Sequence, residues 1–222
     1  MSRPMSRVAL IHAVTVAVDP VKAAFAELWP DADTINILDD SLSGDRARDA
    51  ELTEAMRNRI GSLGDYALSV GSEAVLFTCS AFGGAIEALA RRVDVPVLKP
   101  NEAMFDDALG MGNRIGMIAT FGPSVAGMEA EFEEQRRTKQ SHATLKTILV
   151  EAAMNALKGG DAKTHNELVA AAVKQLDGVD VVMLAHFSTS RAFEAVSQRT
   201  KKPVLTSPRS AVSALRARLG IH

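Results

Sequence analysis

Short runs of apolar and β-branched residues alternate along the chain with longer stretches rich in Ala, Leu, Glu and Arg. Each apolar run predicts a strand, and the runs lie at residues 8–12, 34–38, 74–78, 95–98, 114–120, 146–150, 179–185 and 203–206. The stretches between them have helical periodicity and lie at about 20–28, 45–63, 84–92, 103–110, 124–135, 151–158, 163–176, 190–199 and 210–219. This alternation is typical of parallel sheets with helices on both faces. We therefore predict an α/β fold.

The chain also matches itself at a single fixed offset. Residues 71–100 align with 178–207 without a gap, and nine of the thirty pairs are identical. Residues 7–11 align with 114–118 at the same offset. An internal repeat of this kind indicates two similar structural units.

We predict two lobes related by a pseudo-twofold axis, each a parallel four-stranded sheet flanked by helices. The first lobe is expected to comprise 1–98 plus 205–222, and the second 99–204. Equivalent strand ends of two such lobes can face each other, so we expect the active site in the cleft between them.

Composition favours a soluble globular protein. The chain of 222 residues is 47% hydrophobic and 23% charged, with a formal net charge of −2. That charge gives no basic surface for nucleic acid or an anionic membrane, and no apolar run approaches the ~20 residues of a membrane span. The single cysteine excludes an internal disulfide, and the start of the chain lacks the layout of a signal peptide. We expect a cytoplasmic homo-oligomer that binds neither nucleic acid nor membrane.

Ligands of open parallel sheets bind beyond the carboxyl ends of the strands, so residues at those ends are candidates for a site. Cys79, the only cysteine, follows the predicted strand 74–78, and small residues and a predicted helix come after it. A helix N-terminus favours a thiolate, and free backbone N–H groups there favour a substrate carboxylate. We predict a partly exposed, functional thiol with a lowered pKa. The alternative is a buried cysteine that acts as a small hydrophobe.

His186 is the counterpart of Cys79 in the second copy of the repeat and follows the predicted strand 179–185. A thiol and an imidazole have ordinary pKa values of about 8.5 and 6.5, so both exchange protons near neutral pH. On opposite sides of a substrate, they suit the removal of a proton from one face of a carbon and its delivery to the other. The alternative is a structural histidine that donates to a backbone carbonyl.

Further polar and aromatic residues near the predicted strand ends are candidates for substrate binding. They are Ser80, Ala81, Thr120, Phe121, Phe187, Ser188, His12 and Asn101. His12 ends the first predicted strand and is expected to line the cleft, and the amide of Asn101 could bind a carboxylate. The remaining histidines show no metal-ligand spacing, so we expect no metal site.

The motif around Cys79 carries a resemblance to a known family. The sequence LFTCSAFG at 76–83, with its counterpart position after an apolar strand in the second copy, resembles the Asp/Glu racemase superfamily. That superfamily includes aspartate, glutamate and hydantoin or allantoin racemases, maleate cis–trans isomerase and arylmalonate decarboxylase. The resemblance covers essentially the whole chain. It implies two pseudo-symmetric α/β halves, no cofactor and two thiols that flank the α-carbon of the substrate; Cys79 matches the first thiol, and His186 stands where the second is expected.

We therefore predict a cofactor-independent isomerase or racemase that acts by proton transfer at the α-carbon of a small carboxylate or amino-acid-like substrate. A thiol–imidazole pair is asymmetric, unlike two thiols, so other reactions stay open. They are a one-thiol decarboxylase or lyase reaction, cis–trans isomerisation on the same scaffold, and Cys/His hydrolysis. A non-catalytic protein that binds a small molecule is a further alternative. Fold alone does not choose between these functions.

Overall fold

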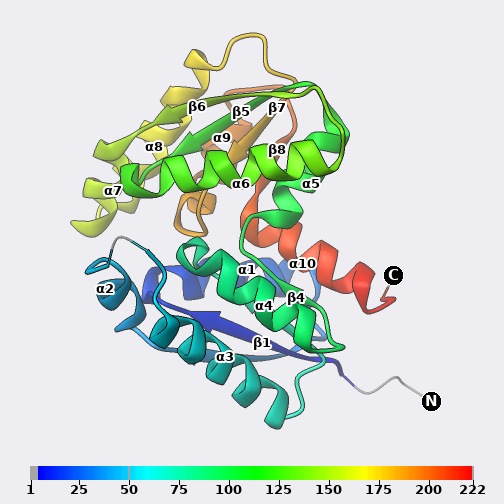
Figure 1. Ribbon diagram of the computed structural model, residues 1–222. Coiled ribbons are helices and arrows are strands. Elements are labelled where there is room, and N and C mark those ends of the chain that lie inside the picture. The colour runs from blue at the N-terminus through cyan, green and yellow to red at the C-terminus, as the bar shows by residue number, and fades with distance from the viewer. Residues whose placement is uncertain (1–4, 50, 222) are drawn as a thin grey trace. The chain divides into compact units, whose positions relative to one another are not determined.

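A computed structural model describes residues 5–49 and 51–221 and divides the chain into two compact units. Unit 1 comprises residues 1–100 and 211–222, and unit 2 comprises residues 101–210. Each unit holds one four-stranded parallel sheet flanked by helices (Figure 1). The predicted α/β fold class is therefore confirmed. Among the described residues, no helix combines the length and the apolar character needed to cross a bilayer.

In unit 1 the strand order is β2-β1-β3-β4, and every pair is parallel. The strands are β1 (Arg7–His12), β2 (Asp33–Leu38), β3 (Ala74–Phe77) and β4 (Val97–Leu98). The helices between them are α1 (Val18–Leu28), α2 (Leu42–Arg46), α3 (Glu54–Ser69) and α4 (Gly83–Arg92), with the 3₁₀ segments η1 (Thr15–Ala17) and η2 (Ser80–Phe82). On one face of the sheet, Ile11 and Phe77 share a core with Ile60 of α3 and Ile86 of α4.

In unit 2 the order is β6-β5-β7-β8, again all parallel. The strands are β5 (Arg114–Ala119), β6 (Thr144–Leu149), β7 (Val181–Leu184) and β8 (Val204–Thr206). The helices are α5 (Glu102–Met111), α6 (Val125–Thr138), α7 (Glu151–Lys158), α8 (Ala162–Ala172) and α9 (Phe193–Ser197), with the 3₁₀ segments η3 (Gly122–Ser124), η4 (Val173–Gln175) and η5 (Ser188–Ala192). Met183 faces the core under α5 and α6, and Leu184 faces the core under α8 and α9. Both faces are thus covered, which explains why β7 is apolar throughout.

The two sheets have the same strand order and the same register at the offset of the sequence repeat. The matching pairs are Val8–Ala74 and Ile115–Val181, then Val75–Val97 and Val182–Val204. The 3₁₀ segments η1 and η3 also begin at positions related by this offset. The repeat in the sequence is therefore also a repeat of topology.

Each unit is completed by a helix that follows the last strand of the other. α5 follows β4 of unit 1 but belongs to unit 2. α10 (Ser207–Arg218) follows β8 of unit 2, and its residues from Ala211 onward belong to unit 1. There the guanidinium of Arg216 donates to the carbonyl of Leu28, at the end of α1 (2.6 Å).

The helix predicted at 45–63 is instead two helices, α2 and α3. α3 begins after Thr53, whose hydroxyl oxygen accepts the N–H of Met56 (3.3 Å), and such a cap marks a helix start. The interruption matters for the candidate site because α2 ends at Arg46, whose charge acts on Cys79.

Candidate active site

Cys79 lies just after β3 and caps the 3₁₀ segment η2. Its backbone is extended (φ −123°, ψ 125°), so the chain turns only after this residue. The side chain is half-buried, and the backbone N–H of Ala81 acts on the thiol by lowering its pKa. The turn of small residues therefore places a backbone N–H near the thiol.

Burial raises the pKa of the Cys79 thiol, so the lowered pKa predicted from the sequence is wrong. The hydrogen bond from Ala81 and the positive charge of Arg46 both lower this pKa, but burial is the larger effect. The α-helix itself begins only at Gly83, and a helix dipole acts mainly within the first turn. At neutral pH the group is a protonated thiol, which is an acid.

Arg46 is a further candidate that no sequence motif marks. Its Nε donates to the carbonyl of Ala81 (3.3 Å), two residues after Cys79. Arg59 of α3 anchors the segment that carries Arg46, because it donates to Asp39 (2.6 Å) and Asp45 (2.7 Å). The only signal in the sequence is a mixture of Asp and Arg at 39–48, which is also typical of a solvated helix.

His12 ends β1 and is fully buried. Its Nε2 lies 3.0 Å from the amide oxygen of Asn36, and its Nδ1 lies 3.0 Å from the hydroxyl of Thr78. An amide oxygen only accepts, so Nε2 carries the proton, and the Thr78 hydroxyl donates to Nδ1, which is nearer to it than its other acceptor, the carbonyl of Ile11 (3.4 Å). Burial lowers the pKa of His12 and keeps the ring neutral. Both ring nitrogens are engaged, so His12 orients Thr78, which precedes Cys79; its contact with substrate stays a prediction.

His186 follows β7 and has a backbone in the left-handed region (φ 70°), which residues other than glycine adopt infrequently. Its Nε2 lies 2.6 Å from the hydroxyl oxygen of Ser124. Its Nδ1 is buried and makes no hydrogen bond with the described residues. Burial lowers the pKa of His186 to about 4, and the carbonyl of Ala185 offsets part of that effect. At neutral pH His186 is an uncharged imidazole, which is a base.

Four predicted binding residues lie beside His186 in the fold or follow it in the chain. Thr120 is buried at the end of β5, and its hydroxyl lies 3.1 Å from that of Thr189 in η5. Phe121 is 42% exposed, and the ammonium of Lys158 lies over its ring, 5.9 Å from the ring centre, so its contact with substrate stays a prediction. Phe187 and Ser188 are buried, at 2% and 5% exposure. The Phe187 ring is thus packed inside the protein, and a contact of this ring with substrate stays a prediction.

Asn101 lies at the start of α5 and is 1% exposed. Its side-chain oxygen accepts from the hydroxyl of Ser207 (2.9 Å), the first residue of α10. Within unit 1 the fold gathers Ser80 and Ala81 next to Cys79, after β3. Within unit 2 the candidates gather after β5 and β7. Both groups lie at the carboxyl ends of parallel strands, where such sheets bind ligands.

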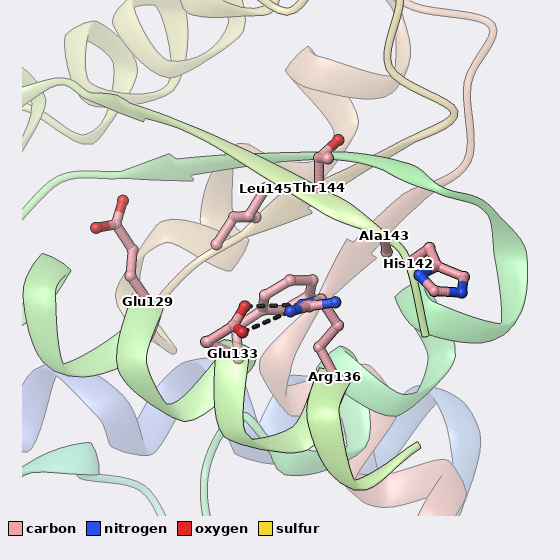
Figure 2. Close-up of a pocket in the computed structure, with 8 residues that line it drawn as sticks. Glu129, Glu133, Arg136, His142, Ala143, Thr144 and Leu145 are labelled. Atoms are coloured by element: carbon pink, nitrogen blue, oxygen red, sulfur yellow. Dashed lines mark hydrogen bonds and ion pairs between the residues drawn. The ribbon is translucent and has the colours of Figure 1, made fainter. Parts of the chain in front are cut away.

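A surface hollow of about 550 Å³ lies elsewhere in unit 2, between α6 and the start of β6 (Figure 2). Its lining residues are Glu129, Phe132, Glu133, Arg136, His142, Ala143, Thr144 and Leu145. Arg136 is paired with Glu133 (2.6 Å), and the hollow lies at the amino end of β6, away from the strand ends that carry His186. Among residues 5–49 and 51–221, no group of three His, Cys, Asp or Glu could hold a metal ion.

A family model described as Asp/Glu/Hydantoin racemase matches residues 13–185. The chain belongs to this family. It is therefore an enzyme of the racemase and isomerase type. No curated protein sequence matches the chain.

Solved structures agree with the racemase family on the fold. A glutamate racemase from Bacillus anthracis is 13% identical, with a TM-score of 0.72 over 99% of this chain and 84% of that one. The aspartate racemase of Picrophilus torridus is 16% identical, with a TM-score of 0.71 over 98% and 95%. A glycine-to-cysteine mutant of arylmalonate decarboxylase is also 16% identical, with a TM-score of 0.71 over 96% and 93%. At these identities the likeness is one of fold.

Proposed function

We propose that this racemase-family member is a cofactor-independent isomerase or racemase. It moves a proton at the α-carbon of a small carboxylate or amino-acid-like substrate, with Cys79 and His186 on opposite faces of that carbon. One observation carries the proposal. Cys79 and His186 follow equivalent strands, β3 and β7, at the same offset in two sheets of the same register.

The protonation states suit one direction of transfer. His186, held neutral by burial, takes the proton from the α-carbon, and the electron pair of the broken C–H bond delocalises into the carboxylate. Cys79, held protonated by burial, delivers its proton to the other face. The products of this step are an imidazolium and a thiolate, and the positive charge of Arg46 stabilises the thiolate. Proton exchange with water then restores the resting pair.

A decarboxylase is the second candidate, because the raised pKa of Cys79 favours it. Loss of CO₂ from a malonate-like substrate leaves an electron pair on the same carbon. A protonated thiol on one side is then sufficient to complete the reaction, and no base is needed. Cys79 would be the proton donor in this reaction too, whereas His186 would only shape the site.

Incubation in D₂O with a panel of amino acids, hydantoins, malonates and hydroxy acids tests both candidates. Deuterium at one carbon with inversion and no gas release identifies an isomerase, and CO₂ release identifies a decarboxylase. For an isomerase, Cys79→Ala and His186→Gln should each lower the rate by about 10²–10⁴-fold, as loss of a general acid or base does. His142→Gln, which removes an exposed imidazole at the hollow of Figure 2, is the matched control. Full activity of Cys79→Ala would refute both candidates.

A further inference from the structure

The hydroxyl of Ser124 lies between two groups of unit 2 and touches both. Its oxygen is 2.6 Å from Nε2 of His186 and 2.9 Å from the carbonyl oxygen of Phe121. Ser124 ends η3, just after β5, and His186 follows β7, which pairs with β5 in the sheet. We propose that Ser124 is a positioning residue that fixes the proton of neutral His186 on Nε2, so that Nδ1 is the atom that accepts the substrate proton. The second half of this statement rests on the proposed function.

The donors and acceptors that these groups carry set the direction of each hydrogen bond. A hydroxyl has one proton to donate and can also accept. The carbonyl of Phe121 can only accept, so the Ser124 proton points to Phe121. The Ser124 oxygen must then accept from His186, which places the imidazole proton on Nε2. A neutral imidazole carries one N–H, so Nδ1 keeps a free lone pair.

The surroundings of Nδ1 agree with this assignment. Nδ1 is buried and makes no hydrogen bond with the described residues, and the carbonyl of Ala185 favours the charged form of the ring, in which Nδ1 carries a proton. Leaving a buried polar atom without a partner is unfavourable, and such exceptions often have a functional cause. The left-handed backbone of His186 is a second exception of this kind, because strained conformations cluster at functional sites.

Each bond made or broken in the proton transfer can be assigned to these atoms. The lone pair of Nδ1 forms a new N–H bond with the α-proton, and the C–H electron pair stays on the substrate. The ring then carries N–H on both nitrogens. Nε2 still donates to Ser124, and the carbonyl of Ala185, which already favours the charged ring, stabilises the new cation.

Nitrogen NMR of the protein labelled with ¹⁵N-histidine tests the tautomer without any substrate. At pH 7 the expected spectrum of His186, assigned with His186→Gln, is that of the Nε2–H tautomer. Ser124→Ala should lose this preference, and Ser124→Thr, which keeps the hydroxyl, should retain it. An Nδ1–H tautomer in the wild type, or an unchanged tautomer in Ser124→Ala, would overturn the proposal.

Ser190→Ala is the matched control. Ser190 makes the same kind of bond as Ser124, from its hydroxyl to the carbonyl three residues earlier, that of Phe187 (2.7 Å). Its loss should leave the His186 spectrum unchanged, and a change there equal to that in Ser124→Ala would overturn the specific role of Ser124.

Kinetics with an identified substrate add a second readout. Hydrogen-bond partners that orient metal-bound histidines typically matter by about 10–100-fold, and we expect Ser124→Ala to lower kcat by a similar factor with little change in KM. Ser124→Thr should restore most of the rate. An Nε2–H tautomer in a protein that exchanges no α-proton would keep the role of Ser124 and refute the proposed function. A kcat of Ser124→Ala equal to that of the wild type would refute the role of Ser124 in the reaction.

Discussion

Protonation of His186 should occur near pH 4 and should weaken the fold as it occurs. Burial lowers the pKa of this imidazole from 6.5 to about 4. In the unfolded chain the ring takes up its proton near pH 6.5. Between these two pH values the unfolded state binds more protons than the folded state, so stability falls as the pH falls. The stability that the folded protein gains from keeping His186 neutral is fully present above about pH 6.5 and is lost by about pH 4.

The size of the effect follows from the shift. One pKa unit corresponds to about 1.4 kcal/mol, so the shift of His186 from 6.5 to about 4 corresponds to about 3 kcal/mol. Urea unfolding of the wild type and of His186→Gln, measured from pH 7.5 to pH 4, isolates this term because all other titrating groups are shared. The difference between their free energies of unfolding should move by about 3 kcal/mol in favour of the variant at low pH.

Proton NMR of the ring gives a direct reading of the same pKa. The His186 resonance, assigned by its loss in His186→Gln, should move with a midpoint near pH 4. The acidic limb of any activity that uses His186 as a base should fall at the same pH. A midpoint at pH 6 or above, together with parallel stability curves for the two proteins, would refute the assignment of His186 as a base held neutral by burial.

Three further predictions test the core and the surroundings of the thiol. Gly116→Ala would place a Cβ 2.8 Å from a buried methyl of Leu176, so it should lower the free energy of unfolding by about 1–3 kcal/mol. Adding Leu176→Ala to this variant should recover part of the loss. Full stability of Gly116→Ala alone would contradict this packing. Arg46→Gln removes a charge that lowers the pKa of Cys79, so iodoacetamide should alkylate the thiol more slowly near pH 8, and an unchanged rate would count against it. Hydrogen bonds lower the pKa of the Asp180 carboxylate to about 2, so Asp180→Asn should lower the free energy of unfolding at pH 7. The difference in this free energy between variant and wild type should shrink as the pH falls from about 4 to about 2, and a difference independent of pH would contradict this.

The sheets were predictable because their central strands are buried on both faces. A strand such as β7 must then be apolar at every position, and this produces a continuous run that a sequence displays directly. The repeat indicated that the two units resemble each other, since two copies of one pattern imply one topology. The predicted strands 8–12 and 114–120 differ from β1 and β5 by one residue at one end.

The electrostatics of the site were not predictable in the same way. The thiol pKa depends on how much of the protein surrounds Cys79, and burial at one residue is set by segments far away in the sequence. The position of Arg46 likewise depends on the break between α2 and α3 and on ion pairs made by Arg59, which belongs to the next helix along the chain. The periodicity of neighbouring residues therefore predicts neither the burial of Cys79 nor the position of Arg46.

The two copies of the repeat have diverged in the polar groups that support their candidate residues. At the offset of the repeat, Ser124 corresponds to Ala17, which has no hydroxyl, and His12 corresponds to Ala119, which has no imidazole. In the copy that carries His186, Ser124 is therefore a hydrogen-bond partner for a nitrogen of the His186 ring. In the copy that carries Cys79, the equivalent residue Ala17 offers no side-chain hydrogen bond. Two thiols would need similar surroundings to act alike in both directions of a racemisation. Different partners at equivalent positions agree instead with the fixed roles proposed above, in which His186 is the base and the thiol is the acid.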